Sequence, residues 1–236
     1  MIILPDIHGR LFWKNAVKDH ENETIVFLGD YLDPYSHEHI SEEDAIANFE
    51  EIIQFKKDHP KNVFLLLGNH DCGYIWPSVN ECRRSWRYKN DIAHMFIENL
   101  DLFDLAYQCE INGKKYLLSH SGVHKEWLDK VYDRYDINHI ANYLNNWLRV
   151  ELDDVIASYL GIYSSYRGYS LDKYGSCVWA DVREWRPNED NWNIYQIFGH
   201  TQLESEPIIT DSFACLDVRK GFLLDETTNE IIEINE

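Results

Sequence analysis

The stretch from Val63 to Asp71 reads VFLLLGNHD, and it indicates the fold class more clearly than any other part of the chain. Five consecutive apolar residues are typical of a buried strand, and the glycine and polar residues after them end that strand abruptly. Four other apolar runs end in the same way, before PDIHG (residues 5–9), GDYLD (29–33), SHSG (119–122) and GHTQ (199–202). Each predicts a buried strand followed by a loop.

Helical periodicity separates two of these strands. Apolar residues recur near helical spacing between Glu42 and Asp58, at Ala45, Ile46, Phe49, Ile52, Ile53 and Phe55. Alternation of strand and helix predicts an α/β fold. Ligands of open α/β sheets bind beyond the carboxyl ends of the strands, and all five polar motifs lie at such ends.

The later part of the chain has a different pattern. Residues 125–193 are rich in Trp, Tyr and charged residues, and we expect Trp127 to Tyr163 to be mostly helical. This segment is predicted to be a cap or insertion within a single domain of residues 1–236. The alternation in FACLDV, GFLLDE and EIIEI predicts a terminal group of antiparallel strands that extends a second sheet, with a turn around Thr227 to Asn229.

Composition limits the possible partners and surroundings. The 236 residues contain 22 Lys and Arg against 41 Asp and Glu, a net charge of -19 that disfavours nucleic-acid and anionic lipid surfaces. The five cysteines form no CxxC pair, and we expect them to be reduced thiols. No signal peptide or membrane span is evident, so the expected location is the cytoplasm.

The polar residues at the strand ends suggest a metal site only when they are taken together. Singly, each Asp or His is most simply a turn or structural residue. Together, six residues from five strand ends can converge on one edge of the fold, and a central carboxylate can bridge two ions. Carboxylate, imidazole and amide ligands suit Mn²⁺, Fe or Zn²⁺, and the absence of thiolates argues against a structural zinc site. The six are Asp6, His8, Asp30, Asn69, His120 and His200.

These motifs, D-x-H, G-D-x-x-D, G-N-H-[DE], a mid-chain His and a late G-H, occur in an order that resembles the calcineurin-like metallophosphoesterases. The resemblance spans Asp6 to His200 and implies a four-layered fold in which two mixed β-sheets pack together between helices. GHTQ lacks the second histidine that many phosphodiesterases and nucleases of this fold have. The sequence is therefore more similar to the branch containing the serine/threonine protein phosphatases and symmetrical diadenosine tetraphosphatases.

The resemblance also implies a role for each motif residue. Asp6 and His8 would bind a first metal, Asp30 would bridge, and Asn69, His120 and His200 would complete a second. His70 matches the family's catalytic histidine, and Asp33 matches the carboxylate that orients it. The implied reaction is phosphomonoester hydrolysis by a metal-activated hydroxide with His70 as general acid, and Mn²⁺ is the favoured ion over Fe, Zn²⁺ or Ni²⁺.

Two positions depart from the family pattern. Pro5 replaces a usual Gly, and Pro34 replaces a usual phosphate-binding Arg. Arg183 is the preferred substitute for that contact, and the alternatives are Arg83, Arg84, Arg87 and Arg186. An arginine in so acidic a protein is more commonly part of a surface ion pair.

Other features have simpler interpretations. The stretch Ser36 to His39 is expected to be a solvated loop, and no thiol chemistry is expected of Cys72. The tryptophans of the insertion can form a base-stacking pocket or a small core, and the core is favoured; they are Trp127, Trp147, Trp179, Trp185 and Trp192.

Three alternatives to a phosphomonoesterase remain open at this stage. A dinucleoside polyphosphate hydrolase is the closest. A nuclease or cyclic phosphodiesterase is disfavoured by Gln202 and the net charge. A catalytically inactive metal-binding or partner-binding module is disfavoured because the ligands, His70 and Asp33 are all present.

Overall fold

A computed structural model describes residues 1–76, 78–79, 83–150, 154–168, 170–185 and 192–234. The first sheet has the strand order β11-β10-β1-β2-β3-β4, and β1 to β4 are parallel. Its strands are β1 (Ile2–Leu4), β2 (Ile25–Phe27), β3 (Val63–Leu66), β4 (Phe103–Asp104), β10 (Phe222–Leu224) and β11 (Ile231–Glu233).

The second sheet has the order β5-β6-β7-β9-β8. Its strands are β5 (Ala106–Ile111), β6 (Lys114–Ser119), β7 (Tyr195–Phe198), β8 (Ile208–Ile209) and β9 (Phe213–Cys215). β5 and β6 form an antiparallel hairpin, whereas β6, β7 and β9 are parallel. The five strands that carry the motifs, β1, β2, β3, β6 and β7, are all among the parallel strands, which is why the motifs can meet.

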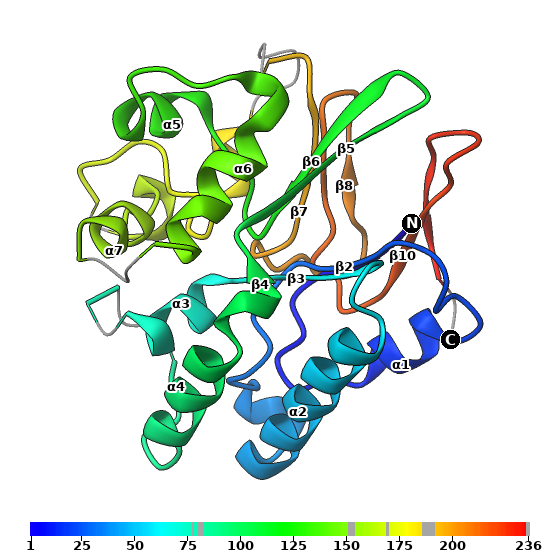
Figure 1. Ribbon diagram of the computed structural model, residues 1–236, viewed down its shortest axis with the longest axis vertical. Coiled ribbons are helices and arrows are strands. Elements are labelled where there is room, and N and C mark those ends of the chain that lie inside the picture. Colours follow the sequence, from blue (N-terminus) through cyan, green and yellow to red (C-terminus); the bar gives the residue numbers. More distant parts are fainter. Residues whose placement is uncertain (77, 80–82, 151–153, 169, 186–191, 235–236) are drawn as a thin grey trace.

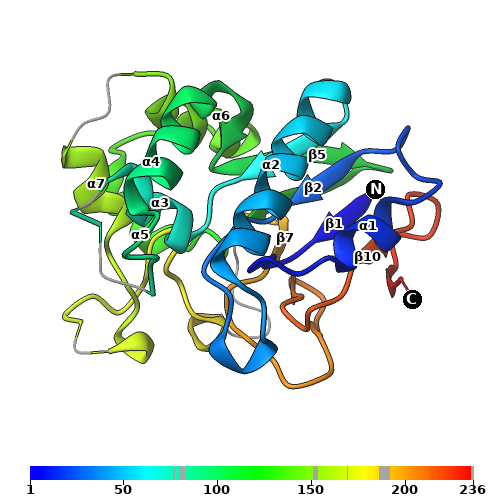
Figure 2. The same cartoon turned by 90° about the horizontal axis from the view of Figure 1, so that it is seen from below.

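Helices form the outer layers. They are α1 (Phe12–Val17), α2 (Glu42–Asp58), α3 (Asn69–Ile75), α4 (Lys89–Glu98), α5 (Lys125–Val131), α6 (Ile140–Asn145) and α7 (Asp154–Leu160). Short 3₁₀ turns are η1 (Ser36–Glu38), η2 (Leu100–Leu102), η3 (Ile137–His139), η4 (Asn146–Leu148), η5 (Ser165–Arg167) and η6 (Val182–Glu184). Helices α1, α2 and α4 lie next to one another below the first sheet, and α5 and α6 lie beside the second (Figure 1, Figure 2).

The alternation of side chains along the strands produces the layers. In β1 and β2, Ile3 and Val26 belong to the apolar cluster shared with Leu118 and Ile197 of the second sheet. Their neighbours Ile2, Leu4 and Phe27 belong to the cluster that includes helix residues such as Trp13 and Phe49. Both faces of the first sheet are therefore buried, as the four-layered architecture predicts.

Most of the predicted elements are confirmed. Helix α2 has the predicted bounds, and Ser41 caps it by accepting a hydrogen bond from the Asp44 N–H at 3.0 Å. The predicted turn after Asp225 is present, since the Asn229 N–H donates to the Asp225 carbonyl. Among the described residues, no helix is both long and apolar enough to cross a membrane.

The prediction of one antiparallel group at the end of the chain was wrong. β9 joins the second sheet, where it is parallel to β7, while β10 and β11 form a hairpin that pairs with β1 in the first sheet. The three alternating segments look alike because each has an apolar face toward a core. Alternation predicts a strand, but it does not identify the sheet that the strand joins.

Candidate metal centre and active site

The loops after β1, β2, β3, β6 and β7 converge on one buried site. Parallel strands end at the same edge, so the residues that follow them meet there although they are up to 194 positions apart, as Asp6 and His200 are. All eight metal-binding and catalytic candidates are at most 8% exposed: Asp6, His8, Asp30, Asp33, Asn69, His70, His120 and His200.

Left-handed backbone turns several of these side chains inward. His8, Asp30, Asp33 and His200 have φ angles of 45°, 53°, 59° and 61°. Non-glycine residues adopt this conformation at a cost of roughly 1–3 kcal/mol each, and they persist in it when surrounding contacts impose it. Four of the eight candidates share this strain, which is a pattern found at functional sites.

Two glycines allow the carboxylates to approach the neighbouring loops. A Cβ atom on Gly68 would lie 2.1 Å from Asp30 Oδ1, and one on Gly199 would lie 2.3 Å from Asp6 Oδ1. Both distances are far below van der Waals contact. The glycines of the GNHD and GHTQ motifs are therefore required by the close approach of Asp30 and Asp6.

Four donor atoms gather around one point on the side of the second sheet. His120 Nε2 lies 3.0 Å from Asn69 Oδ1, 3.0 Å from His200 Nδ1 and 3.6 Å from Asp30 Oδ2. His120 Nδ1 lies 2.8 Å from the Leu28 carbonyl. Because a carbonyl only accepts hydrogen bonds, Nδ1 carries the proton, and in a neutral ring Nε2 directs its lone pair at the other three atoms.

The His8 ring is arranged in the same way with respect to Asp30. Its Nδ1 donates to the Leu32 carbonyl at 2.7 Å, and its Nε2 faces Asp30 Oδ2 at 3.5 Å. Burial lowers the pKa of His8 to about 3, and burial together with Arg167 lowers the pKa of His200. Burial raises the pKa of Asp30, but His120, His70 and His8 outweigh it and the net pKa is lowered to about 2. The lowered pKa values of His8 and His200 favour the neutral imidazole, and the lowered pKa of Asp30 favours its carboxylate.

This donor set fits divalent cations. The Nε2 atoms of His8 and His120 face the Asp30 carboxylate, and Nδ1 of His200 lies 3.0 Å from Nε2 of His120. A cation relieves such facing acceptors, while a buried acceptor with no donor costs free energy. Two groups have ligand atoms within 4.8 Å of one another: His8, Asp30 and His70, and Asp30, His120 and His200. Asp30 belongs to both.

A second network fixes His70 beside this centre. His70 Nδ1 lies 2.8 Å from Asp33 Oδ2, and the Tyr74 hydroxyl donates to Asp33 Oδ1 at 2.6 Å. The His70 N–H also donates to Asp30 Oδ1 at 3.0 Å. Both oxygens of Asp33 are therefore engaged, which fixes the orientation of the imidazole.

Sequence reasoning assigned no role to two other residues of this network. Tyr74 lies one helical turn after His70 on α3, a spacing that places the two side chains on one face. Asp71 Oδ2 accepts from the N–H groups of Gly68 at 2.8 Å and Asp30 at 2.7 Å, and thereby joins two of the motif loops. The fourth position of GNHD marked Asp71 in the sequence, but its partner Asp30 is 41 positions away in the chain.

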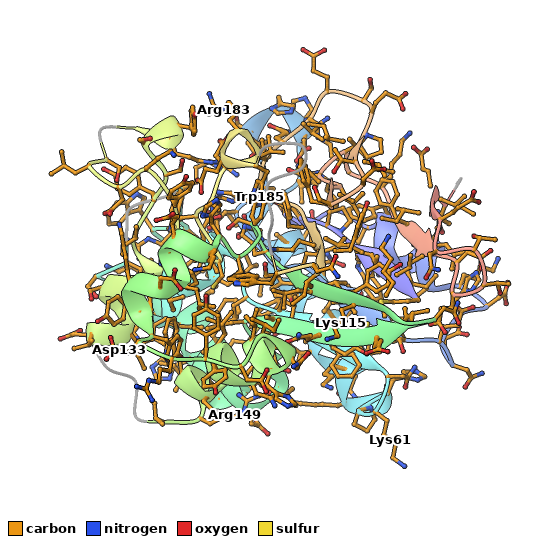
Figure 3. The ribbon with its side chains drawn as sticks, turned by 90° about the horizontal axis from the view of Figure 1, so that it is seen from above. Lys61, Lys115, Asp133, Arg149, Arg183 and Trp185 are labelled. Carbon is orange, nitrogen blue, oxygen red and sulfur yellow. The ribbon has the colours of Figure 1, made fainter. Side chains whose placement is uncertain are left out.

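The arginines divide into those that reach the site and those that do not. Arg167 Nη2 donates to Thr201 Oγ1 at 2.7 Å and lies 3.4 Å from the His200 carbonyl, and Arg83 Nη2 donates to the Asp33 carbonyl at 2.8 Å. Arg183 instead bonds Asp181 Oδ1 at 2.7 Å and lies at the edge of the molecule (Figure 3).

The remaining arginine candidates also lie apart from the metal ligands. Arg87 pairs with Glu43 at 3.0 Å, and Arg84 donates to the Gly73 carbonyl. Arg186 lies outside the described residues.

The insertion contributes both to the core and to the site. Trp127 and Trp147 belong to the main apolar cluster, as their assignment to a core predicted, and α6 packs on β5. The loop part approaches the centre, since the Trp179 ring lies 5.6 Å from the His200 ring between centroids. Trp185 packs on Phe198 and Phe213, and Trp192 packs against the main cluster.

Two minor predictions have clear outcomes. Ser36, His37 and His39 are exposed in η1 and the residue after it, whereas Glu38 is half-buried and bonds Arg10 at 2.8 Å. The described cysteines are free thiols, namely Cys72, Cys109, Cys177 and Cys215; Cys82 lies outside the described residues.

Comparisons with known proteins agree with this geometry. A sequence model of the calcineurin-like phosphoesterase family matches residues 2–203. The serine/threonine-protein phosphatase PP1-delta of Caenorhabditis elegans is 31% identical over 145 residues, which cover 56% of this chain and 42% of that relative. The chain thus spans less than half the length of the curated relative that it matches, and the relative supports the resemblance to the serine/threonine phosphatase branch.

Solved structures support the fold. A cold-active protein-tyrosine phosphatase of a psychrophilic Shewanella species has a TM-score of 0.61 at 15% identity, with 98% of this chain and 76% of that chain covered. A Saccharomyces cerevisiae serine/threonine phosphatase similar to human PP5 has a TM-score of 0.51 at 16% identity, with 91% and 65% covered. With the family match over residues 2–203, the chain belongs to the calcineurin-like phosphoesterases, which are metal-dependent phosphoester hydrolases.

Proposed function

We propose that this chain hydrolyses phosphomonoesters at a centre that holds two divalent cations, with Mn²⁺ favoured over Fe, Zn²⁺ or Ni²⁺. Asp6 and His8 would hold the first ion, Asp30 would be shared by both, and Asn69, His120 and His200 would hold the second. The observation that carries the proposal is the convergence of Asn69 Oδ1, His200 Nδ1 and Asp30 Oδ2 within 3.6 Å of His120 Nε2.

Cations held at this centre would stabilise charge on the phosphoryl oxygens and lower the pKa of bound water toward ~7. The chain's own part is to position groups around the phosphoryl group. A substrate that approaches so acidic a protein needs local positive charge, and Arg167 adds to it beside His200. Arg183, predicted from the sequence to bind phosphate, shares Asp181 with Arg167 and is the second candidate for this contact.

His70 acts in this proposal as the general acid. Asp33 holds Nδ1, so Nε2 transfers the proton to the oxygen of the leaving group. Tyr74 keeps Asp33 in place from the other side. His70 also lies within the first group of metal-ligating atoms, so its role as an acid must be separated from a role as a ligand by experiment.

The names of the similar proteins support one class of substrate. The relatives and structural neighbours are named as protein phosphatases, and we propose a phosphorylated protein side chain as the substrate. Phosphodiesterase or nuclease chemistry is disfavoured at Gln202, where many such enzymes of this fold have a ligand histidine. The side-chain amide of Gln202 pairs with Arg219 when its Oε1 is the acceptor.

The test of this proposal compares leaving groups. A general acid matters most for poor leaving groups, and such proton transfer typically contributes ~10²–10⁴-fold. His70→Asn should slow alkyl phosphates by about that factor and p-nitrophenyl phosphate far less, with metal content unchanged. Asp33→Asn should show a smaller loss of the same form. Rates plotted against leaving-group pKa, with elemental analysis of each variant, measure both effects.

Two outcomes would contradict these assignments. Equal rate losses on all substrates, or loss of bound metal from His70→Asn, would remove the general-acid role. Absence of turnover by the wild type with Mn²⁺ across phosphomonoesters would instead remove the phosphomonoesterase function and favour an inactive metal-binding module.

A further inference from the structure

A cavity of about 560 Å³ adjoins the active site between α2, α3 and α4. Asp33, Pro34 and Tyr74 line its inner end, and α4 residues Ile92 and Ala93 line the opposite wall. Its volume lies within the range of ligand pockets in proteins. The three metal-ligand strand ends of the second sheet and of β1 contribute nothing to its lining, so the cavity is a separate space next to the centre.

The cavity lies next to the residues that act on the leaving group of the substrate. Asp33 holds His70, and His70 donates to the leaving oxygen under the proposed function on which this inference rests. Tyr74 bridges the two spaces, because its hydroxyl donates to Asp33 and accepts from the Ser85 N–H at 2.8 Å. The cavity therefore lies against Asp33, beside the His70–Asp33 pair that protonates the leaving group in the proposed function.

The charges at the cavity oppose those of the whole molecule. Arg83, Arg84 and Lys89 line it in a protein with a net charge of -19. Arg83 and Arg84 donate to the uncharged carbonyls of Asp33 and Gly73. Within the part of the chain that the structure describes, none of these three cations forms a salt bridge with a carboxylate. Glu42 is the exposed acid that lines the same cavity, and Asp33 is engaged by His70 and Tyr74.

Most of the remaining lining, apart from Ser85 and Asn90, is apolar, and it includes an exposed aromatic ring. Ile40 and Ile46 contribute to the wall, and Trp86 at the rim is 84% exposed with Lys89 Nζ 5.5 Å from its ring centroid. An apolar surface with cations around it suits a chain segment that carries apolar and acidic side chains. It suits a basic segment poorly, since like charges repel.

We propose that this cavity is a specificity subsite for the leaving group, occupied by acidic residues that flank the phosphorylated side chain of a peptide. Arg84 and Lys89 pair with the flanking carboxylates, and Trp86 covers the peptide from the rim. The subsite makes acidic phosphopeptides the preferred substrates of the proposed phosphomonoesterase, which reconciles an acidic protein with an acidic substrate.

Matched peptides test the proposal. Two phosphotyrosine peptides of one length, with two Asp or two Asn on each side of the phosphotyrosine, differ only in charge. We expect the wild type to prefer the acidic peptide by about 10-fold in kcat/KM at low salt, because partly exposed ion pairs each contribute a small factor. The preference should decrease at 0.5 M salt, since screening weakens exposed pairs.

Two variants with the same charge change provide the comparison. R84Q/K89Q should reduce the ratio of the two kcat/KM values to about one, and Lys89→Gln alone should reduce it by about 3-fold without removing a backbone hydrogen bond. The control R87Q/K61Q should keep the wild-type ratio, because neither residue lines the cavity and Lys61 lies at the opposite edge from Arg183 (Figure 3).

The outcomes separate this inference from the proposed function. Hydrolysis of p-nitrophenyl phosphate without discrimination between the peptides, or discrimination that survives in both cavity variants, overturns the subsite alone. A stronger preference for a nucleoside polyphosphate, lost in R84Q/K89Q, overturns the peptide as occupant. Absence of hydrolysis of every phosphomonoester by the wild type overturns the proposed function itself.

Discussion

Arg167 and Arg183 share one carboxylate, Asp181, but they differ in what else they contact. Arg167 Nε lies 3.0 Å from Asp181 Oδ2, and Nη2 of the same guanidinium reaches Thr201 and the His200 carbonyl. Arg183 is held by Asp181 and the Tyr166 carbonyl, and its side chain is 57% exposed. Position beside a candidate metal ligand thus distinguishes two residues that the sequence presents as equivalent cations.

This difference yields a prediction about substrate binding. Hydrogen bonds to charged groups contribute about 1.5–3 kcal/mol, which corresponds to roughly 10-fold or more in binding. Arg167→Gln should raise KM for p-nitrophenyl phosphate by about 10-fold, and Arg183→Gln by less than about 3-fold. Steady-state kinetics of both variants at fixed Mn²⁺ measures this. The reverse order of the two effects would restore Arg183 as the main phosphate contact.

At the scale of elements, the turn η6 depends on a buried carboxylate. Glu184 is 4% exposed, accepts from the N–H groups of Asp181 at 2.8 Å and Gly175, and completes a capping box with Asp181. Burial raises the pKa of Glu184 to about 7, from an ordinary value of 4.5. The folded state therefore holds this proton more tightly than the unfolded state does.

The sign of the resulting pH dependence follows from linkage. Stability from the raised pKa is fully present below about pH 4.5 and is lost as pH rises through about 7. Relative to Glu184→Gln, whose Oε1 can still accept the same N–H groups, the wild type should lose on the order of 3 kcal/mol between pH 4.5 and 8. Urea unfolding of both proteins across this range measures the difference. Parallel stability curves would show that the carboxyl is ionised throughout.

Much of the fold was predictable, because the local sequence patterns that end each strand also mark where the strands of the sheet end. Buried strands that end in GD, GNHD or GHTQ can be predicted without knowledge of distant contacts, because an apolar run and the glycine after it determine the local backbone. The partners of Asp71, Tyr74 and Arg167 were not predictable, because each is brought to the site by contacts 33 to 41 residues away. The same reason explains why the sheet joined by β9 was missed: register and sheet choice depend on the whole core.

At the scale of the whole molecule, hydrogen-bond acceptors from both sheets are buried at the centre. Asp6 and Asp30 are each 2% exposed, and burial raises the pKa of Asp6. Without a cation, the lone pairs of His8 and His120 face the Asp30 carboxylate at 3.5 and 3.6 Å. Five strand ends from two sheets carry these atoms, so an ion that binds them also links the sheets.

Metal binding should therefore stabilise the whole fold. A ligand at about 100 times its Kd adds about 2.7 kcal/mol, and for a chain of this size each kcal/mol raises Tm by roughly 2–4 °C. Mn²⁺ should raise Tm of the EDTA-treated wild type by about 5–10 °C. Differential scanning calorimetry with elemental analysis measures the shift together with the number of ions bound.

Asp30→Asn is the variant that decides whether one residue joins both ions. If Asp30 contacts both, the substitution should abolish most of the Mn²⁺-dependent rise in Tm and lower the affinity of both sites together. The metal-free variant should unfold at or below the Tm of the metal-free wild type, because the lowered pKa of Asp30 means that the fold stabilises its ionised carboxylate, and the substitution removes that charge. An asparagine Oδ1 can still accept from the His70 N–H, which preserves the loop contact. Retention of two ions and of the full Tm rise would show that the two sheets are joined at this edge without a bridge at Asp30.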